Sequence, residues 1–352
     1  MITAGWDDRA CLWRVEDGGL EAVLTGHESK LPTPDFSPDG TLLATPDEEG
    51  SLRLWRAQAG GDIARKSIHT APVTGLTVSK GTTVSVGEDG FLGIWQTSTD
   101  RTRTCSVGRT LLETVTATED GSLLAIGDAD GQISIVESAT GSVGASWPAC
   151  TNGIHALRFS PDGMLLASAG GDTTIHLWNP ATGQLERELL GHENDVNGLA
   201  TDPDSGTLFS VSSDGTVRHW LWRNGEEVNL FYVGEPLYSI AYTPVQQTPA
   251  AGSQRGRIYL WDLEESEPVP LVLPSETAVR ALAFVGDGKW LATGGDDGQI
   301  SPWDLESREA VTIPAHGAHR VDNWRTGRSM TCSSALGQTA GFAHGRFTLS
   351  RS

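Results

Sequence analysis

The sequence has little basic charge and no long apolar run. Its 352 residues include 45 Asp and Glu against 25 Lys and Arg, which gives a formal net charge of −20. It contains no stretch of about 18 consecutive apolar residues, so we predict no membrane-spanning segment. A surface this acidic repels phosphate groups, and we therefore expect neither nucleic-acid nor anionic-membrane binding.

Cysteine and lysine are also scarce. The four cysteines are far apart and form no Cys-x-x-Cys pair, which indicates reduced thiols. The first 15 residues lack the basic region and the apolar core of a secretory signal. Only 4 of the 25 basic residues are lysine, a composition that suggests a GC-rich bacterial genome. The expected location is the bacterial cytoplasm.

The common sequence signatures of catalysis are missing. The chain has no G-x-x-x-x-G-K-[ST] phosphate loop, no G-x-S-x-G elbow, no H-E-x-x-H pair and no calcium loop. We therefore predict a protein that is not an enzyme, with no catalytic residue, no metal site and no cofactor.

A repeated unit is abundant instead. Tryptophans that end a β-type run recur, with Val136 filling one gap, at Trp13, Trp55, Trp95, Trp178, Trp220, Trp261 and Trp303. Their mean interval of about 41 residues is the length of a four-stranded propeller blade. A stricter pattern, Ser/Thr-x3-Asp-x5-Trp, holds in five repeats, and the second repeat has Glu49 in place of Asp. Asp-Gly pairs inside the repeats predict hairpin turns.

These repeats resemble the WD-repeat β-propeller family, with a Gly191-His192 opening and Trp-Asp closings at Trp261 and Trp303. The resemblance covers residues 1–313. It implies an all-β propeller of four-stranded antiparallel blades, and in each complete repeat a buried hydrogen-bonded tetrad of His, Ser or Thr, Asp and Trp. The complete tetrads are His69, Ser85, Asp89 and Trp95, and His192, Ser210, Asp214 and Trp220. We expect the departing repeats, such as the one with Cys150 at the His position, to depend on apolar packing alone.

The two ends of the chain decide the number of blades. The first repeat lacks its innermost strand, whereas the tail, residues 314–352, offers His316 and the segment 320–324 at approximately the family's spacing. We favour eight blades, with the tail inserted as the innermost strand of the first blade. The alternative uses residues 26–313 as seven complete blades.

Two sets of surface residues follow from the register of such a ring. The residue before each tetrad Asp lies at the mouth of the channel, and this rim set is Trp6, Glu48, Glu88, Ala129, Gly171, Ser213, Gln254 and Asp296. One residue of each innermost strand points into the channel, and this channel set is Pro32, Thr74, Glu113, His155, Asn197, Tyr238 and Arg280. With eight blades, Asp296, Trp6, Glu48 and Glu88 are consecutive. Such an acidic arc around an indole suits a peptide that bears Lys or Arg; otherwise these are solvated turn residues.

The predicted function is a non-catalytic interaction scaffold that binds a protein or a basic peptide at the channel-mouth face. We expect the scaffold to be a monomer, and Tyr238, His155 and Arg280 to contribute to the partner site. One alternative is a propeller enzyme, which requires a tight cluster of Glu113, His155 and Arg280 at the channel. Another is a regulatory propeller split from a larger bacterial signalling protein.

Overall fold

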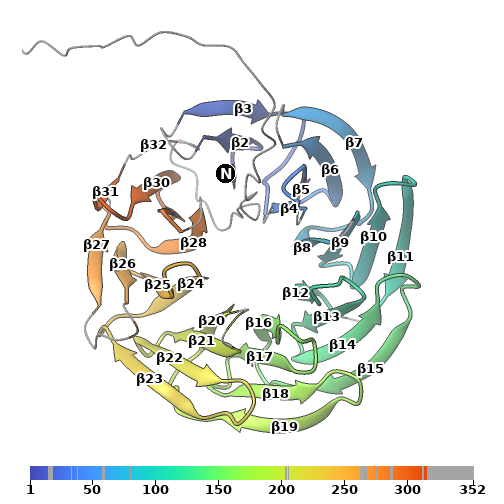
Figure 1. Cartoon of the computed structure of the whole chain (residues 1–352). Coiled ribbons are helices and arrows are strands. Elements are labelled where there is room, and N and C mark those ends of the chain that lie inside the picture. The colour runs from blue at the N-terminus through green and yellow to red at the C-terminus, as the bar shows by residue number, and fades with distance from the viewer. Residues whose placement is uncertain are drawn as a thin grey trace, which may run out of the picture.

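Eight antiparallel β-sheets surround a central channel in the computed structural model of the chain (Figure 1). It describes residues 1–314 except 15–18, 33, 38, 58–59, 80, 109, 203, 205, 262, 264–267, 274–275, 286–287 and 311–312. The described elements are all strands. Within that part of the chain, no helix able to cross a membrane is found. The predicted all-β propeller with eight blades is confirmed.

Six blades have four strands that pair in chain order from the channel to the outside of the ring. Blade 2 consists of β4 (Asp35–Phe36), β5 (Leu42–Pro46), β6 (Ser51–Arg56) and β7 (Gly61–Ser67). Blade 3 consists of β8 (Val73–Ser79), β9 (Thr82–Gly87), β10 (Phe91–Gln96) and β11 (Arg101–Ser106). Blade 4 consists of β12 (Leu112–Ala117), β13 (Leu123–Asp128), β14 (Gln132–Glu137) and β15 (Val143–Pro148).

The next three blades repeat this order. Blade 5 consists of β16 (Ile154–Phe159), β17 (Leu166–Gly170), β18 (Ile175–Asn179) and β19 (Gln184–Leu189). Blade 6 consists of β20 (Val196–Asp202), β21 (Thr207–Ser212), β22 (Thr216–Leu221) and β23 (Glu227–Tyr232). Blade 7 consists of β24 (Leu237–Thr243), β25 (Thr248–Ser253), β26 (Arg257–Leu260) and β27 (Val269–Val272).

The first and last blades differ from this pattern. Blade 1 has three described strands, β1 (Ile2–Ala4), β2 (Ala10–Trp13) and β3 (Leu20–Leu24). Blade 8 has β28 (Val279–Val285), β29 (Trp290–Gly295), β30 (Gln299–Asp304) and β31 (Glu309–Ala310), and β32 (Ile313–Pro314) also pairs with β30. The predicted insertion of the tail into blade 1 concerns residues 315–352, which lie outside the described residues.

Apolar seams between neighbouring blades form the core. The tryptophans that end the third strands are at most 7% exposed. At the seam between blades 5 and 6, for example, Trp220 packs with Ala167, Leu177 and Leu189 of blade 5. A single blade leaves this apolar face uncovered, so each blade is stable only against its neighbours.

A hydrogen-bonded network ties blade 6 together. His192 bonds through Nδ1 to Asp214 at 3.0 Å and through Nε2 to the Ser210 hydroxyl at 2.8 Å, and the Trp220 indole donates to the same hydroxyl at 2.9 Å. Burial by itself would raise the pKa of Asp214, but hydrogen bonds from His192, Thr216 and the Glu193 amide hold that pKa well below its usual value. The carboxylate therefore stays ionised inside the network.

Blades 2 and 3 contain variants of this network. In blade 3, His69 bonds to Asp89 and Ser85, but the Trp95 indole donates to Asp100 rather than to Ser85.

In blade 2, the acidic partner is Asp47, not Glu49. His27 bonds to Asp47 at 2.8 Å and to Thr45 at 2.7 Å, and Trp55 donates to Thr45. The strict spacing pattern missed Asp47 because this carboxylate comes two residues earlier in the turn.

Two departing blades also have polar ties, so the expectation that they depend on apolar packing alone is wrong. In blade 7, the buried Glu235 accepts a hydrogen bond from the Tyr259 hydroxyl at 2.8 Å and lies 3.5 Å from Arg257. In blade 5, the Trp178 indole donates to Ser168 at 2.8 Å. The Cys150 thiol, at the position of the missing His, has its pKa raised first by burial and then by a hydrogen bond with Asp172.

Candidate functional site

A β-bulge at the same place in six blades builds the channel. In β8, β12, β16, β20, β24 and β28 the register with the next strand skips one residue, and the skipped residues are Thr74, Glu113, His155, Asn197, Tyr238 and Arg280. A bulge bends the strand and redirects the extra side chain. These six residues are the predicted channel set without Pro32.

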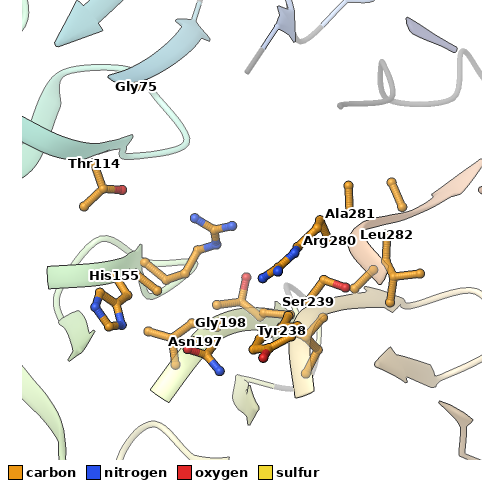
Figure 2. A pocket seen from close by; sticks show the side chains of 18 of the residues that line it. Gly75, Thr114, His155, Asn197, Gly198, Tyr238, Ser239, Arg280, Ala281 and Leu282 are labelled. Carbon is orange, nitrogen blue, oxygen red and sulfur yellow. The ribbon is translucent and has the colours of Figure 1, made fainter. Parts of the chain in front are cut away.

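The six bulged residues line one cavity of about 580 Å³. Figure 2 shows His155, Asn197, Tyr238 and Arg280 around this cavity, on strands of four successive blades. Arg158 and Thr201 also line it. The cavity is therefore polar and carries charges of both signs.

Arg280, Tyr238 and Asp296 form one group at the mouth of the channel. The Arg280 guanidinium donates from Nε and Nη2 to the two carboxylate oxygens of Asp296, both at 3.2 Å, and lies 4.3 Å from the Tyr238 ring centroid. A bidentate pair that also stacks on an aromatic ring is held in a defined orientation. Because Arg280 neutralises Asp296, this residue adds no net charge to the predicted acidic arc.

Trp6 and Glu48 are brought together by a lysine that the sequence analysis did not single out. The Lys30 ammonium lies 4.2 Å from the Trp6 ring centroid and 3.7 Å from the Glu48 carboxylate. The Glu48 amide also donates to the Lys30 carbonyl at 3.1 Å. The same backbone hydrogen bond recurs in other blades. The amide of the rim residue donates to the carbonyl of the residue two positions before the channel residue, as in Glu88 to Pro72 and Asp296 to Ala278. The position two residues before the channel residue Pro32 is the sequence signal that would have included Lys30.

The Glu88 side chain is exposed and forms no ion pair with any residue in the described ranges. The predicted acidic arc therefore divides into a sector of blades 1 to 3, with Trp6, Glu48 and Glu88, and Asp296 of blade 8, which Arg280 neutralises. Lys30 offsets the charge of Glu48, so the net negative charge of the first group comes from Glu88, and we call this group the acidic sector.

The residues that an enzyme site would need share the cavity but do not form a cluster. His155 and Glu113 form no ion pair or side-chain hydrogen bond with each other or with another described residue, and Arg280 is paired with Asp296. Among the residues that the structure places, no group of three or more His, Cys, Asp or Glu is arranged to hold a metal ion. The cavity lining therefore presents hydrogen-bonding groups and charges of both signs, and no contact among the described residues pairs Glu113 with His155.

This architecture, with repeated four-stranded sheets, buried indoles and a polar channel, defines a repeat-built β-propeller. The family described as WD domain, G-beta repeat matches residues 18–56, 141–179, 183–220 and 271–304. Each match ends at a third-strand tryptophan or one residue after it. Four repeats of the chain thus match the WD-repeat family, and the fold is that of an eight-bladed β-propeller.

Similarity to individual proteins is partial. Angio-associated migratory cell protein from Homo sapiens is 29% identical over 187 residues, which cover 40% of this chain and 43% of that protein. Coronin-7 from Rattus norvegicus is 36% identical over 87 residues, 22% of this chain and 9% of coronin-7. This chain therefore matches less than half of the length of either relative.

A solved structure shares the architecture. The crystal structure of the computationally designed Ika8 protein has a TM-score of 0.77 and 23% sequence identity, and the match covers 86% of this chain and 92% of that chain. At this identity the likeness concerns the fold alone.

Proposed function

We propose that this protein is a non-catalytic interaction scaffold that binds a protein or peptide across the channel-mouth face. WD-repeat propellers generally mediate protein interactions. The observation that carries the proposal is the repeated bulge, which directs six side chains into one cavity beside the rim residues of the same blades. Arg280 with Asp296, and Asn197 with Ser213 at 2.8 Å, connect the two sets. The bacterial cytoplasmic location and the monomeric state stay predictions.

A basic segment of the partner fits the acidic sector. Lys30 demonstrates that an ammonium group fits between the Trp6 indole face and the Glu48 carboxylate. A partner Lys or Arg would compete with Lys30 for this position, where it would gain cation–π and charge interactions. Glu88 supplies a further carboxylate on the next blade.

The competition with Lys30 makes the proposal testable with a fluorescein-labelled tetra-arginine peptide. Lys30→Ala removes the internal competitor, so we expect the peptide to bind about three- to tenfold more tightly in fluorescence anisotropy. Trp6→Ala and Glu88→Gln should each weaken binding by a similar factor. Glu186→Gln on the outer strand β19 is the matched control and should change nothing. Equal affinity for the wild type, Lys30→Ala and Glu88→Gln would contradict a basic partner at this sector.

A physiological partner can be sought by affinity capture with the wild type and with Glu48→Lys and Glu88→Lys. Loss of the same captured protein from both variants would support the acidic sector. Identical captured proteins in all three experiments would reject it.

A further inference from the structure

The outer strand of blade 6 exposes an apolar row on a free edge. In β23, Val228 is 46% exposed, Leu230 49% and Tyr232 71%. Leu230 and Tyr232 alternate on one face of the strand, and Val228 lies at a bulge where the pairing of β23 with β22 skips one residue. In the described part of the chain β23 pairs only with β22, and Figure 1 shows it on the outside of the ring. Its second edge is therefore open to another strand.

Other outer strands carry the features that prevent strand pairing. Charges interrupt β7 with Asp62, Arg65 and Lys66, β11 with Arg101 and Arg103, and β19 with Glu186, Arg187 and Glu188, although the three charges of β7 form ion pairs with other strands or loops. The shorter strand β27 contains a proline. Charges and prolines are the usual protection of edge strands against added strands.

By contrast, β23 (EVNLFY) has no glycine or proline, and its single charge, Glu227, is paired with Arg218. Its edge is interrupted by the bulge at Val228 but by no unpaired charge, glycine or proline.

A further exposed leucine lies in the linker between blades 5 and 6. Leu230 is the register partner of Arg218, and the Arg218 guanidinium donates to the Gly191 carbonyl at 2.7 Å. Leu190, the residue before Gly191, is 68% exposed.

We propose that β23 is a docking edge for an extended segment of a partner protein, which adds a fifth antiparallel strand to blade 6. Backbone hydrogen bonds would supply affinity, and alternate apolar side chains would cover Val228, Leu230 and Tyr232. The segment carries a basic residue at its C-terminal end, because antiparallel pairing places that end beside the exposed Glu226 and beside Glu227, whose charge Arg218 already shares. A second copy of this chain would bring the same carboxylates and another net charge of −20. This surface is separate from the channel-mouth face.

Two labelled peptides test the proposal by fluorescence anisotropy. The first is Ser-Val-Thr-Val-Thr-Val-Lys-Lys, and the second has proline in place of its central valine, which removes a backbone donor. We expect the first peptide to bind and the second to bind at least about tenfold more weakly. Leu230→Lys should weaken the first peptide at least about tenfold. Ile63→Lys on β7, where Ile63 is 44% exposed, is the matched control and should leave binding unchanged.

Hydrogen exchange and sedimentation complete the test. The bound peptide should protect amides of β23 from exchange, and Glu88→Gln at the channel mouth should not alter its affinity. Equal binding of both peptides, or unchanged binding to a Leu230→Lys variant with wild-type melting temperature, would overturn the proposal. A wild-type dimer in sedimentation equilibrium that Leu230→Lys dissociates would assign the edge to a second copy and also overturn it.

Discussion

Blade 6 and blade 4 have the same strand order and very different interiors. In blade 6, Ser210 links His192 to Trp220, and Arg218 lies 5.9 Å from the Trp220 ring centroid. In blade 4, the positions of Ser210 and Trp220 are occupied by Ile126 and Val136, which are at most 1% exposed. These residues pack with Val84, Val86 and Ile94 of blade 3.

The comparison shows that backbone pairing and seam packing are sufficient to form a blade. The turn of blade 4 still has a carboxylate, since Asp128 accepts hydrogen bonds from the Asp130 and Gln132 amides and from Thr110. What blade 4 lacks is the His–Ser–Trp connection between strands. The network therefore adds stability and a defined geometry to a blade whose topology forms without it. When one partner is lost, the remaining buried polar groups are unpaired and destabilise the folded blade.

Blade 1 extends the comparison, because its channel edge has no described strand. We predict that the tail supplies this strand, so deletion of residues 314–352 should lower the melting temperature by about 10 °C. Differential scanning calorimetry would measure the change. An unchanged melting temperature would exclude the tail as a structural part of blade 1.

A substitution at Ser210 should distinguish the hydrogen-bonded interior of blade 6 from the apolar interior of blade 4. Ser210→Ala leaves His192 Nε2 and the Trp220 indole unpaired, and we expect it to lower the free energy of unfolding by about 2–4 kcal/mol. Ile126→Val at the same position of blade 4 removes one methylene and should cost about 0.5–1.5 kcal/mol. Urea denaturation measures both variants. Equal costs would show that the network adds nothing specific to blade 6.

The seam between blades 6 and 7 should make stability depend on pH. His219 stacks 4.2 Å from Phe209, and burial lowers its pKa to about 4. The unfolded chain binds a proton near pH 6.5, so stability is complete above about pH 6.5 and falls as the pH drops toward 4, by on the order of 1–3 kcal/mol. His219→Phe should flatten this part of the stability profile, whereas His176→Gln should not. A profile that His219→Phe leaves unaltered would contradict this assignment.

The smallest expected effect concerns the side chain of Arg218 in blade 6. Arg218→Met removes the contact with Trp220 and the hydrogen bond to Gly191, at a cost of about 0.5–1 kcal/mol. A Cβ on Gly191, where φ is +147°, would collide with the guanidinium. Gly191→Ala should therefore be less harmful in Arg218→Met than in the wild type. Additive costs in a double-mutant cycle would refute this packing.

Much of the fold could be predicted from spacing alone. The interval of ten residues between Thr3 and Trp13, Thr45 and Trp55, and Ser210 and Trp220 corresponds to an indole that donates to a hydroxyl on the adjacent strand. Hairpin geometry sets this interval, because two antiparallel strands and a tight turn bring those positions together. The misplaced partners, Asp47 for Glu49 and Asp100 for Ser85, occur where a side chain can reach the same group from another position.

The candidate site was predictable as a set of positions but not as a set of charges. The register placed Glu113, His155 and Arg280 at one channel, where they line the same cavity. It did not predict that Arg280 pairs with Asp296, or that Lys30 covers Trp6. Those contacts depend on rotamers and on loops from neighbouring blades, which a repeat spacing does not encode.

The sequence alone determined a ring of repeated β-sheets with one residue of most repeats directed to the channel, because periodic patterns specify strands, turns and register. Tertiary structure decided which charges are neutralised and which indoles are bonded. These properties depend on side chains that meet only after the blades have packed. The surface available to a partner is therefore a property of the assembled ring.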